Sequence, residues 1–128
     1  ALEDLSELRF HTEIPIAVDE SLTDMSSAEQ IIEKQAADVV IIKPMISGGY
    51  RNTKEISDLG KMENIRTIIT SALETNIGLM ANYHIASALE ISEHCGLSTW
   101  KLCGKNPFIK TNSDKIKISE IPGLGITP

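Results

Sequence analysis

Short apolar runs rich in β-branched residues constrain the fold of this chain more than any other feature. The strongest run covers residues 38–42 (Asp-Val-Val-Ile-Ile), and residues 14–18 and 66–70 form similar runs. A strand without polar alternation is typical of a parallel sheet that is covered on both faces. Parallel neighbours are joined by crossovers, usually helices. The sequence therefore predicts an α/β fold in which helices cover a parallel sheet.

The segments between these runs carry helical signals. A helix is predicted near Leu2, Leu5 and Leu8, and another from a capping box of Ser26 and Glu29 towards Ala37. Further predicted elements are a helix through Ile56 and Leu59 after the loop at Gly48-Gly49, a helix from Ile77 to His94 that stops at Gly96, a fourth strand at Ser98–Leu102 and a β-like piece at Lys115–Ile118.

Composition excludes several classes of protein. The 128 residues include 18 acidic and 12 basic side chains, a net charge of -6, which argues against a nucleic-acid binder. At roughly 150 residues per domain, one domain is expected. No apolar run approaches the length of a membrane span, and the first residues lack a signal-peptide pattern. The cysteines, Cys95 and Cys103, are too few for a disulfide scaffold, so we expect a cytoplasmic protein without a membrane partner.

Polar residues follow the apolar runs at Asp19, Lys43 and Ser71. The carboxyl ends of parallel strands lie at one edge of the sheet, where such folds bind ligands. Alternation along each strand places Asp19 on the face of Ala17, and Lys43 on the face of Ile41. An Asp and a Lys at neighbouring strand ends suit either a structural ion pair or a metal-binding carboxylate beside a cation. The residues alone leave both interpretations open.

Four segments resemble the enolase superfamily, in its muconate lactonizing enzyme subgroup. Their order and spacing match that family over nearly the whole chain, and we identify the chain as a member. The segments are Ile14–Leu22, similar to a "PIALDESL" strand; Asp38–Pro44 with Gly48-Gly49, similar to the next strand; Ser71–Gly78, similar to "S-x-L-E-S-x-I-G"; and Ile121–Ile126, similar to a "PGLGI" ending.

The resemblance implies that residues 1–128 are the C-terminal half of a (β/α)8 barrel: strands five to eight and the tail. The first half and the capping domain would lie outside this chain. Four parallel strands cannot close a barrel of eight, and an open sheet exposes unpaired edges. We therefore expect the missing N-terminal half or a second copy as a partner, and no turnover by the 128 residues alone.

The resemblance also implies a site at the carboxyl edge of the sheet. Asp19 would bind Mg²⁺, and Lys43 would face a small-molecule carboxylate substrate. Three residues of the following loop would contact that substrate: Ser71, Glu74 and Thr75. From the residues alone, Ser71 and Thr75 could equally cap the following helix. Glu20 suits either support of the metal ligand or a surface pair. His84 and His94 are expected to have packing or dipole roles, and the cysteines lack zinc-site spacing.

Within the superfamily, the best match is o-succinylbenzoate synthase, a lyase of menaquinone biosynthesis that dehydrates its substrate through an enediolate. Residues 71–76 lack the histidine of mandelate-racemase types. Residues 100–105 lack the acidic residue of dipeptide epimerases and muconate cycloisomerases, which remain alternatives. A phosphoacceptor receiver module is an alternative from another class. In receivers, the order of the motif residues along the chain is Asp, Ser/Thr, Lys-Pro. In this chain, the order is Asp19, Lys43-Pro44, Ser71.

Overall fold

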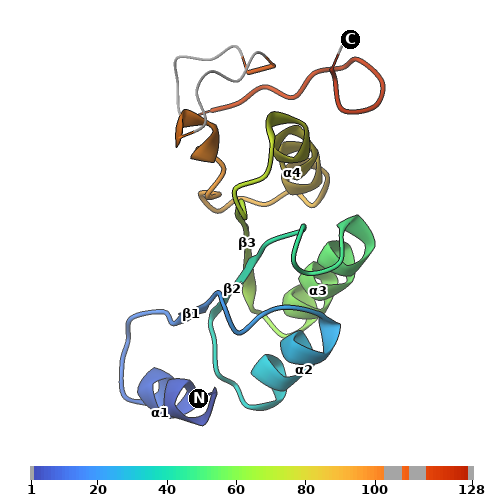
Figure 1. The fold of residues 1–128 in the computed structure, drawn as a ribbon. Coiled ribbons are helices and arrows are strands. Elements are labelled where there is room, and N and C mark those ends of the chain that lie inside the picture. Colours follow the sequence, from blue (N-terminus) through green and yellow to red (C-terminus); the bar gives the residue numbers. More distant parts are fainter. Residues whose placement is uncertain (1, 103–107, 110–114, 127–128) are drawn as a thin grey trace.

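The computed structural model describes residues 2–102, 108–109 and 115–126, and its elements alternate between helices and strands (Figure 1). Cys103 lies outside the described residues. The elements are α1 (Leu2–Phe10), β1 (Ala17–Val18), α2 (Met25–Glu33), β2 (Val39–Ile42), α3 (Tyr50–Met62), β3 (Arg66–Ile69), α4 (Asn76–Ala88) and the 3-10 helix η1 (Thr99–Leu102).

The strands form a three-stranded parallel sheet in the order β1-β2-β3. Figure 1 shows α2, α3 and α4 along one side of this sheet. The strand residues that face these helices are fully buried in the core: Val18, Val40, Ile42 and Ile69. This arrangement confirms the predicted parallel α/β fold, because each crossover helix buries its apolar side on the same face of the sheet.

The opposite face of the sheet is less covered. Val39 is buried on this face, but Ala17 is exposed, and Ile41 and Ile68 towards the carboxyl end are only partly buried. Alternation along the strands continues this face to the first residues after β1 and β2, Asp19 and Lys43. The polar strand ends therefore stand on the face that the helices leave open.

The predicted fourth strand at Ser98–Leu102 is wrong, because Thr99–Leu102 forms η1. The chain meets β3 earlier, at a single parallel bridge between Thr70 and Gly96. A Cβ at Gly96 would lie 2.3 Å from Thr70 Oγ1, so glycine is what permits this close approach. After the bridge the chain turns, and Lys101 N donates to Ser98 O. The β-like piece at Lys115–Ile118 is also not a strand in the structure.

The predicted start and end of α2 are both displaced. Its cap is Asp24, which accepts from Ser27 N at 2.8 Å, while Ser27 Oγ accepts from Asp24 N at 2.9 Å. This is a capping box two residues before the predicted one at Ser26 and Glu29, and the serine hydroxyl takes the part usually played by a glutamate. The helix ends at Glu33 and does not reach Ala37.

The predicted end of α4 near His94 is also wrong, because the helix ends at Ala88. Glu90 has a left-handed conformation with φ 54°, its N–H bonds to Ser87 O, and Ile91 N bonds to Ala86 O. These bonds form a Schellman motif, which satisfies the last carbonyls of a helix. Glycine is usual at the left-handed position, so a glutamate there gives no stop signal in the sequence.

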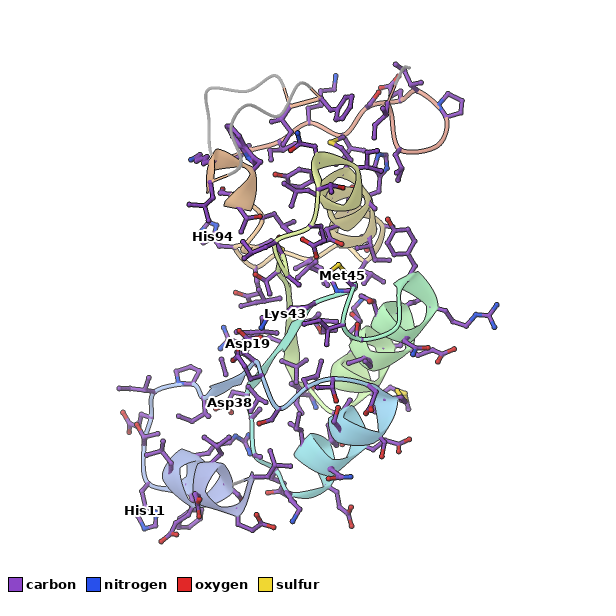
Figure 2. All side chains as sticks on the ribbon, viewed as in Figure 1. His11, Asp19, Asp38, Lys43, Met45 and His94 are labelled. Carbon is purple, nitrogen blue, oxygen red and sulfur yellow. The ribbon has the colours of Figure 1, made fainter. Side chains whose placement is uncertain are left out.

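Asp38 ties three segments together at the amino end of β2, where Figure 2 labels it. One carboxylate oxygen accepts from Ile16 N at 2.8 Å, and the other accepts from Arg9 Nε of α1 at 2.7 Å. The Ile16 hydrogen bond lowers the pKa of Asp38; partial burial opposes the shift, and the Arg9 guanidinium reinforces it. The ionised carboxylate therefore stabilises the packing of α1 and β1 on β2.

Replacing Asp38 by asparagine is expected to lower the free energy of unfolding at pH 7 by about 1.5–3 kcal/mol, the usual contribution of hydrogen bonds to a charged group. The carboxyl pKa is lower in the folded state, so its stabilisation is full above the ordinary aspartate pKa and is lost as pH falls through the folded value. The difference between D38N and the unmodified protein should therefore shrink on acidification. Denaturant unfolding of the full-length protein from pH 7 to pH 3 measures it.

Asp58→Asn is the matched control for that measurement, because the Asp58 carboxylate forms an exposed pair with Lys54 one turn away in α3. It should change stability by less than about 0.5 kcal/mol. Equal effects of the two substitutions at every pH would contradict the role of Asp38.

Candidate functional site

Asp19 and Lys43 meet at the carboxyl edge of the sheet, where Figure 2 shows them close together. The Lys43 Nζ lies 2.5 Å from Asp19 Oδ1, and the two side chains are 16% and 32% exposed. Each residue directly follows its strand, β1 or β2, so the parallel register brings them together. The contact predicted from strand alternation is therefore present.

Glu20 joins this pair through the lysine. Lys43 Nζ donates to Glu20 Oε1 at 3.0 Å, and the Glu20 side chain is 84% exposed. Asp19, and then Glu20, raise the pKa of Lys43, and the same lysine lowers the pKa of Glu20. The site therefore holds an ammonium between one partly buried carboxylate and one solvated carboxylate.

One atom of this cluster lacks a hydrogen bond. Asp19 Oδ1 is shielded from solvent and accepts no hydrogen bond of ordinary geometry, although the Lys43 ammonium balances its charge. Carboxylate oxygens are the ligands that Mg²⁺ prefers in proteins. Asp19 therefore fits one position in the coordination shell of such an ion. Within the described residues there is no group of three His, Cys, Asp or Glu side chains that would hold a metal by itself.

The loop after β3 is organised around Glu74. One carboxylate oxygen accepts from the Ser71 hydroxyl, and the other accepts from Ala72 N at 2.9 Å and from Asn82 Nδ2 of α4 at 3.1 Å. Partial burial of Glu74 opposes its ionisation, but these hydrogen bonds outweigh burial and lower its pKa. Glu74, expected beside the substrate, thus directs both oxygens to its own loop and helix.

Neither Ser71 nor Thr75 caps α4 with its side chain, so the alternative capping role is wrong. Thr75 occupies the cap position of α4, but its side chain makes no cap hydrogen bond and is exposed. Ser71 is buried, and its hydroxyl accepts from Leu73 N at 3.0 Å within the loop. Ser71 therefore shapes the loop, while Thr75 remains exposed at the edge of the sheet.

Sequence reasoning missed two residues of this network, Asn82 and Thr99. Asn82 is 3% exposed and donates to Glu74, and its signal was an amide in the middle of α4, among apolar residues of that helix. Thr99 Oγ1 donates to Ser71 Oγ at 2.8 Å. Thr99 gave no usable signal, because the segment around it was assigned to a strand.

The remaining candidate side chains are His84, His94 and Cys95. His84 is half-buried within α4, and His94 is exposed. Burial raises the pKa of the Cys95 thiol, which suits a structural role. Among the described residues, no helix combines the length and the apolar content needed to cross a bilayer.

Comparison with known proteins decides the family. The sequence profile of the family described as "Enolase C-terminal domain-like" matches residues 1–128. The chain belongs to this family. The parallel strands and their helices are therefore part of an α/β barrel, as predicted, and the phosphoacceptor receiver alternative is not supported.

Two curated relatives show which enzymes the chain is similar to. It is 33% identical over 102 residues to the o-succinylbenzoate synthase of Thermobifida fusca, an alignment that covers 79% of the chain. It is 30% identical over 129 residues to the L-Ala-D/L-Glu epimerase of Clostridium acetobutylicum, which covers 98% of the chain. The matches span 31% and 36% of those two proteins, so the chain has about a third of their length.

Two solved structures resemble the fold. The dipeptide epimerase of Enterococcus faecalis is 27% identical, has a TM-score of 0.87, and matches 99% of this chain and 38% of its own. An enolase of Pseudomonas fluorescens, solved with bound magnesium, potassium and tartrate, is 24% identical with a TM-score of 0.70 over 75% of this chain and 23% of its own. The relatives are thus enzymes of the enolase superfamily, and the second structure shows that a member of this fold holds magnesium.

Proposed function

We propose that this chain is the C-terminal barrel half of a Mg²⁺-dependent enzyme that removes a proton next to a substrate carboxylate. The contact of Lys43 with Asp19 at the carboxyl edge of the sheet carries this proposal. A proton α to a carboxylate is weakly acidic, and its removal places a second negative charge on that carboxylate. A fixed cation beside a carboxylate that holds a metal ion would stabilise this negative charge.

In this proposal, Asp19 supplies one ligand to the magnesium, and Lys43 faces the substrate. When bound, the ion supplies positive charge to the substrate carboxylate. Lys43 holds its ammonium where negative charge develops as the proton leaves. Glu20 keeps the lysine side chain in place from the solvent side, since its carboxylate accepts from Lys43 Nζ. The base and the other ligands would come from the rest of the protein.

The reaction that we favour is the dehydration performed by o-succinylbenzoate synthase, a lyase reaction in menaquinone biosynthesis. It is supported by the 33% identity to the Thermobifida fusca enzyme and by the lack of an acidic residue at positions 100–105. Lys43 then acts as an electrostatic stabiliser rather than as a base.

Dipeptide epimerisation is the second candidate, and the length of the alignment favours it. The epimerase of Clostridium acetobutylicum aligns with 98% of the chain, against 79% for the synthase. In an epimerase, Lys43 would exchange a proton with the substrate. Incubation of the full-length protein in D₂O with Mg²⁺ separates the two. Formation of o-succinylbenzoate from its precursor supports the synthase, whereas α-deuterium incorporation into an alanyl-glutamate dipeptide supports the epimerase.

We further propose that the open side of β1 is covered by the N-terminal half of the same protein or by a second copy. Two apolar side chains before β1 are largely exposed. Phe10, the last residue of α1, is 87% exposed, and Ile14, in the segment between α1 and β1, is 74% exposed. Each square ångström of apolar surface left in water forfeits roughly 25 cal/mol, so cover on this side would stabilise the sheet.

The 128 residues alone are expected to give no measurable turnover, because Asp19 is one ligand and the proposed base lies outside them. The test assays this chain and the full-length protein side by side with Mg²⁺ and the o-succinylbenzoate precursor. Turnover by the short chain near that of the full-length protein would show that a base and a complete metal site exist within these residues, and the proposal of a barrel half would fail.

A further inference from the structure

Leu73 has an unusual backbone conformation for a branched apolar residue. Among the described non-glycine residues, four have positive φ: Gln35, Asn64, Leu73 and Glu90. Three of them directly follow the ends of α2, α3 and α4, where Schellman hydrogen bonds account for the conformation. Leu73, with φ 64°, instead lies before α4. Such a conformation is strained for a side chain of this kind and persists only where surrounding contacts impose it.

The contacts that impose it converge on Ser71. Leu73 N donates to Ser71 Oγ at 3.0 Å, and Thr99 Oγ1 donates to the same oxygen at 2.8 Å. The Ser71 hydroxyl in turn donates to Glu74. A hydroxyl offers one donor and two acceptor sites, so all the capacity of Ser71 is used. The conformation of Leu73 thus depends on the orientation that Glu74 gives to this hydroxyl.

Gly78 provides the space that Glu74 needs. A Cβ at Gly78 would lie 2.8 Å from Glu74 Cβ and 3.2 Å from its Cγ. A glycine inside a helix is destabilising relative to alanine, and Gly78 stands in the first turn of α4. The absence of a side chain at Gly78 therefore allows the carboxylate to reach Ala72 N and Asn82 Nδ2.

The loop held in this way presents Leu73 at the edge of the sheet that carries Lys43. Thr70 N donates to Ile42 O at 3.0 Å, so the end of β3 is level with the end of β2. Leu73 follows three residues later, and its side chain is 65% exposed. An exposed leucine in a strained conformation beside a binding edge is suited to contact an apolar part of a ligand.

We propose that Glu74 is a positioning residue that holds the loop of residues 71–75, and that Leu73, presented by this loop, selects the apolar part of the carboxylate substrate. The proposal rests on the proposed function for its second part. The first part, the hold of Glu74 on the loop, concerns only this chain and is tested without turnover.

Hydrogen exchange of the full-length protein tests the hold on the loop. Glu74→Gln replaces one acceptor oxygen with an NH2 group, which can only donate, and Gly78→Ala displaces the carboxylate without changing it. In both variants we expect the amides of Ala72 and Leu73 to exchange at least ~10-fold faster, because the hydrogen bonds that protect them are lost or weakened. Glu55→Gln, an exposed glutamate of α3, is the control. Unchanged exchange in E74Q would overturn the positioning role, even if G78A failed to fold.

Substrate preference tests Leu73. The probes are the o-succinylbenzoate precursor and an analogue whose succinyl chain is one methylene shorter. We expect Leu73→Ala to change the ratio of their kcat/KM values about 10-fold or more, because one methylene in an apolar contact discriminates by 10–200-fold. Glu74→Gln should shift the ratio in the same direction. Met62→Ala, at an exposed methionine that ends α3, should leave it unchanged.

The outcomes of the two experiments are distinguishable. An unchanged ratio in L73A, with normal turnover of both probes, would overturn the role of Leu73 and leave the proposed function standing. A full-length protein that turned over no carboxylate substrate would overturn the proposed function and the role of Leu73 together. In that case, the exchange rates of Ala72 and Leu73 would still decide whether Glu74 holds the loop.

Discussion

Asp19→Asn is expected to lower the affinity of the full-length protein for Mg²⁺ by at least ~100-fold, since loss of residues that only support metal ligands already costs 10–100-fold. The amide keeps the shape of the side chain but loses the charge that a divalent ion requires. It also leaves the Lys43 ammonium facing a neutral group 2.5 Å away, where the native structure has a carboxylate. Titration calorimetry with Mg²⁺, together with activity measured against Mg²⁺ concentration, gives the change in affinity.

Glu20→Gln is the matched control, because it removes the neighbouring carboxylate from the same lysine. The Glu20 side chain is 84% exposed, so its charge is screened by solvent. We expect less than ~10-fold change in Mg²⁺ affinity for this variant, because exposed charges contribute little. If D19N and E20Q altered the affinity equally, the metal would respond to the net charge of the cluster, and Asp19 would not be a ligand.

Lys43→Ala is expected to lower kcat by ~10²–10³-fold, with a much smaller change in KM. A fixed cation that meets charge present mainly in the transition state acts on the rate of the chemical step more than on substrate binding. The Lys43 side chain is only 16% exposed, which limits the screening of its charge. Steady-state kinetics of the full-length protein at saturating Mg²⁺ measures both parameters.

Lys54→Ala, at a solvated lysine of α3 that pairs with Asp58, should leave kcat and KM within about 2-fold of the unmodified protein. Mg²⁺ affinity must be measured for K43A as well, because the substitution removes the counter-charge of Asp19. If K43A raised only KM, Lys43 would be a substrate-binding residue. If K43A failed to fold, Lys43 would have a structural role in the ion pair with Asp19.

The predictable part of the site follows from the geometry of parallel strands. Asp19 and Lys43 lie together because each directly follows an apolar run, and parallel strands end at the same edge. The apolar run before each residue and the alternation of side chains along a strand can both be read from neighbouring residues. They are enough to place Asp19 and Lys43 on one face of the sheet. The loop after β3 was also located at this edge, because the run at residues 66–70 ends there.

The part that could not be predicted depends on contacts between distant residues. The partners of Glu74 and Ser71 include Asn82 in α4 and Thr99 after the bridge at Gly96. No local pattern pairs Thr99 with a serine 28 residues earlier. The resemblance placed Glu74 beside the substrate, which stays a prediction, and only the folded loop reveals that both of its oxygens accept hydrogen bonds from Ser71, Ala72 and Asn82.

By itself, the sequence determined the parallel α/β class, the carboxyl ends of the strands and the placement of Asp19 beside Lys43, because runs of β-branched residues and their polar ends are properties of neighbouring residues. Tertiary structure alone decided where α4 ends, how the segment around Gly96 meets β3, and what Glu74 contacts. Glu90 takes a left-handed backbone conformation that few residues with side chains adopt. Gly96 has no side chain that would clash with Thr70. Such choices are set by packing and hydrogen bonds between segments, which stabilise conformations that local propensity disfavours.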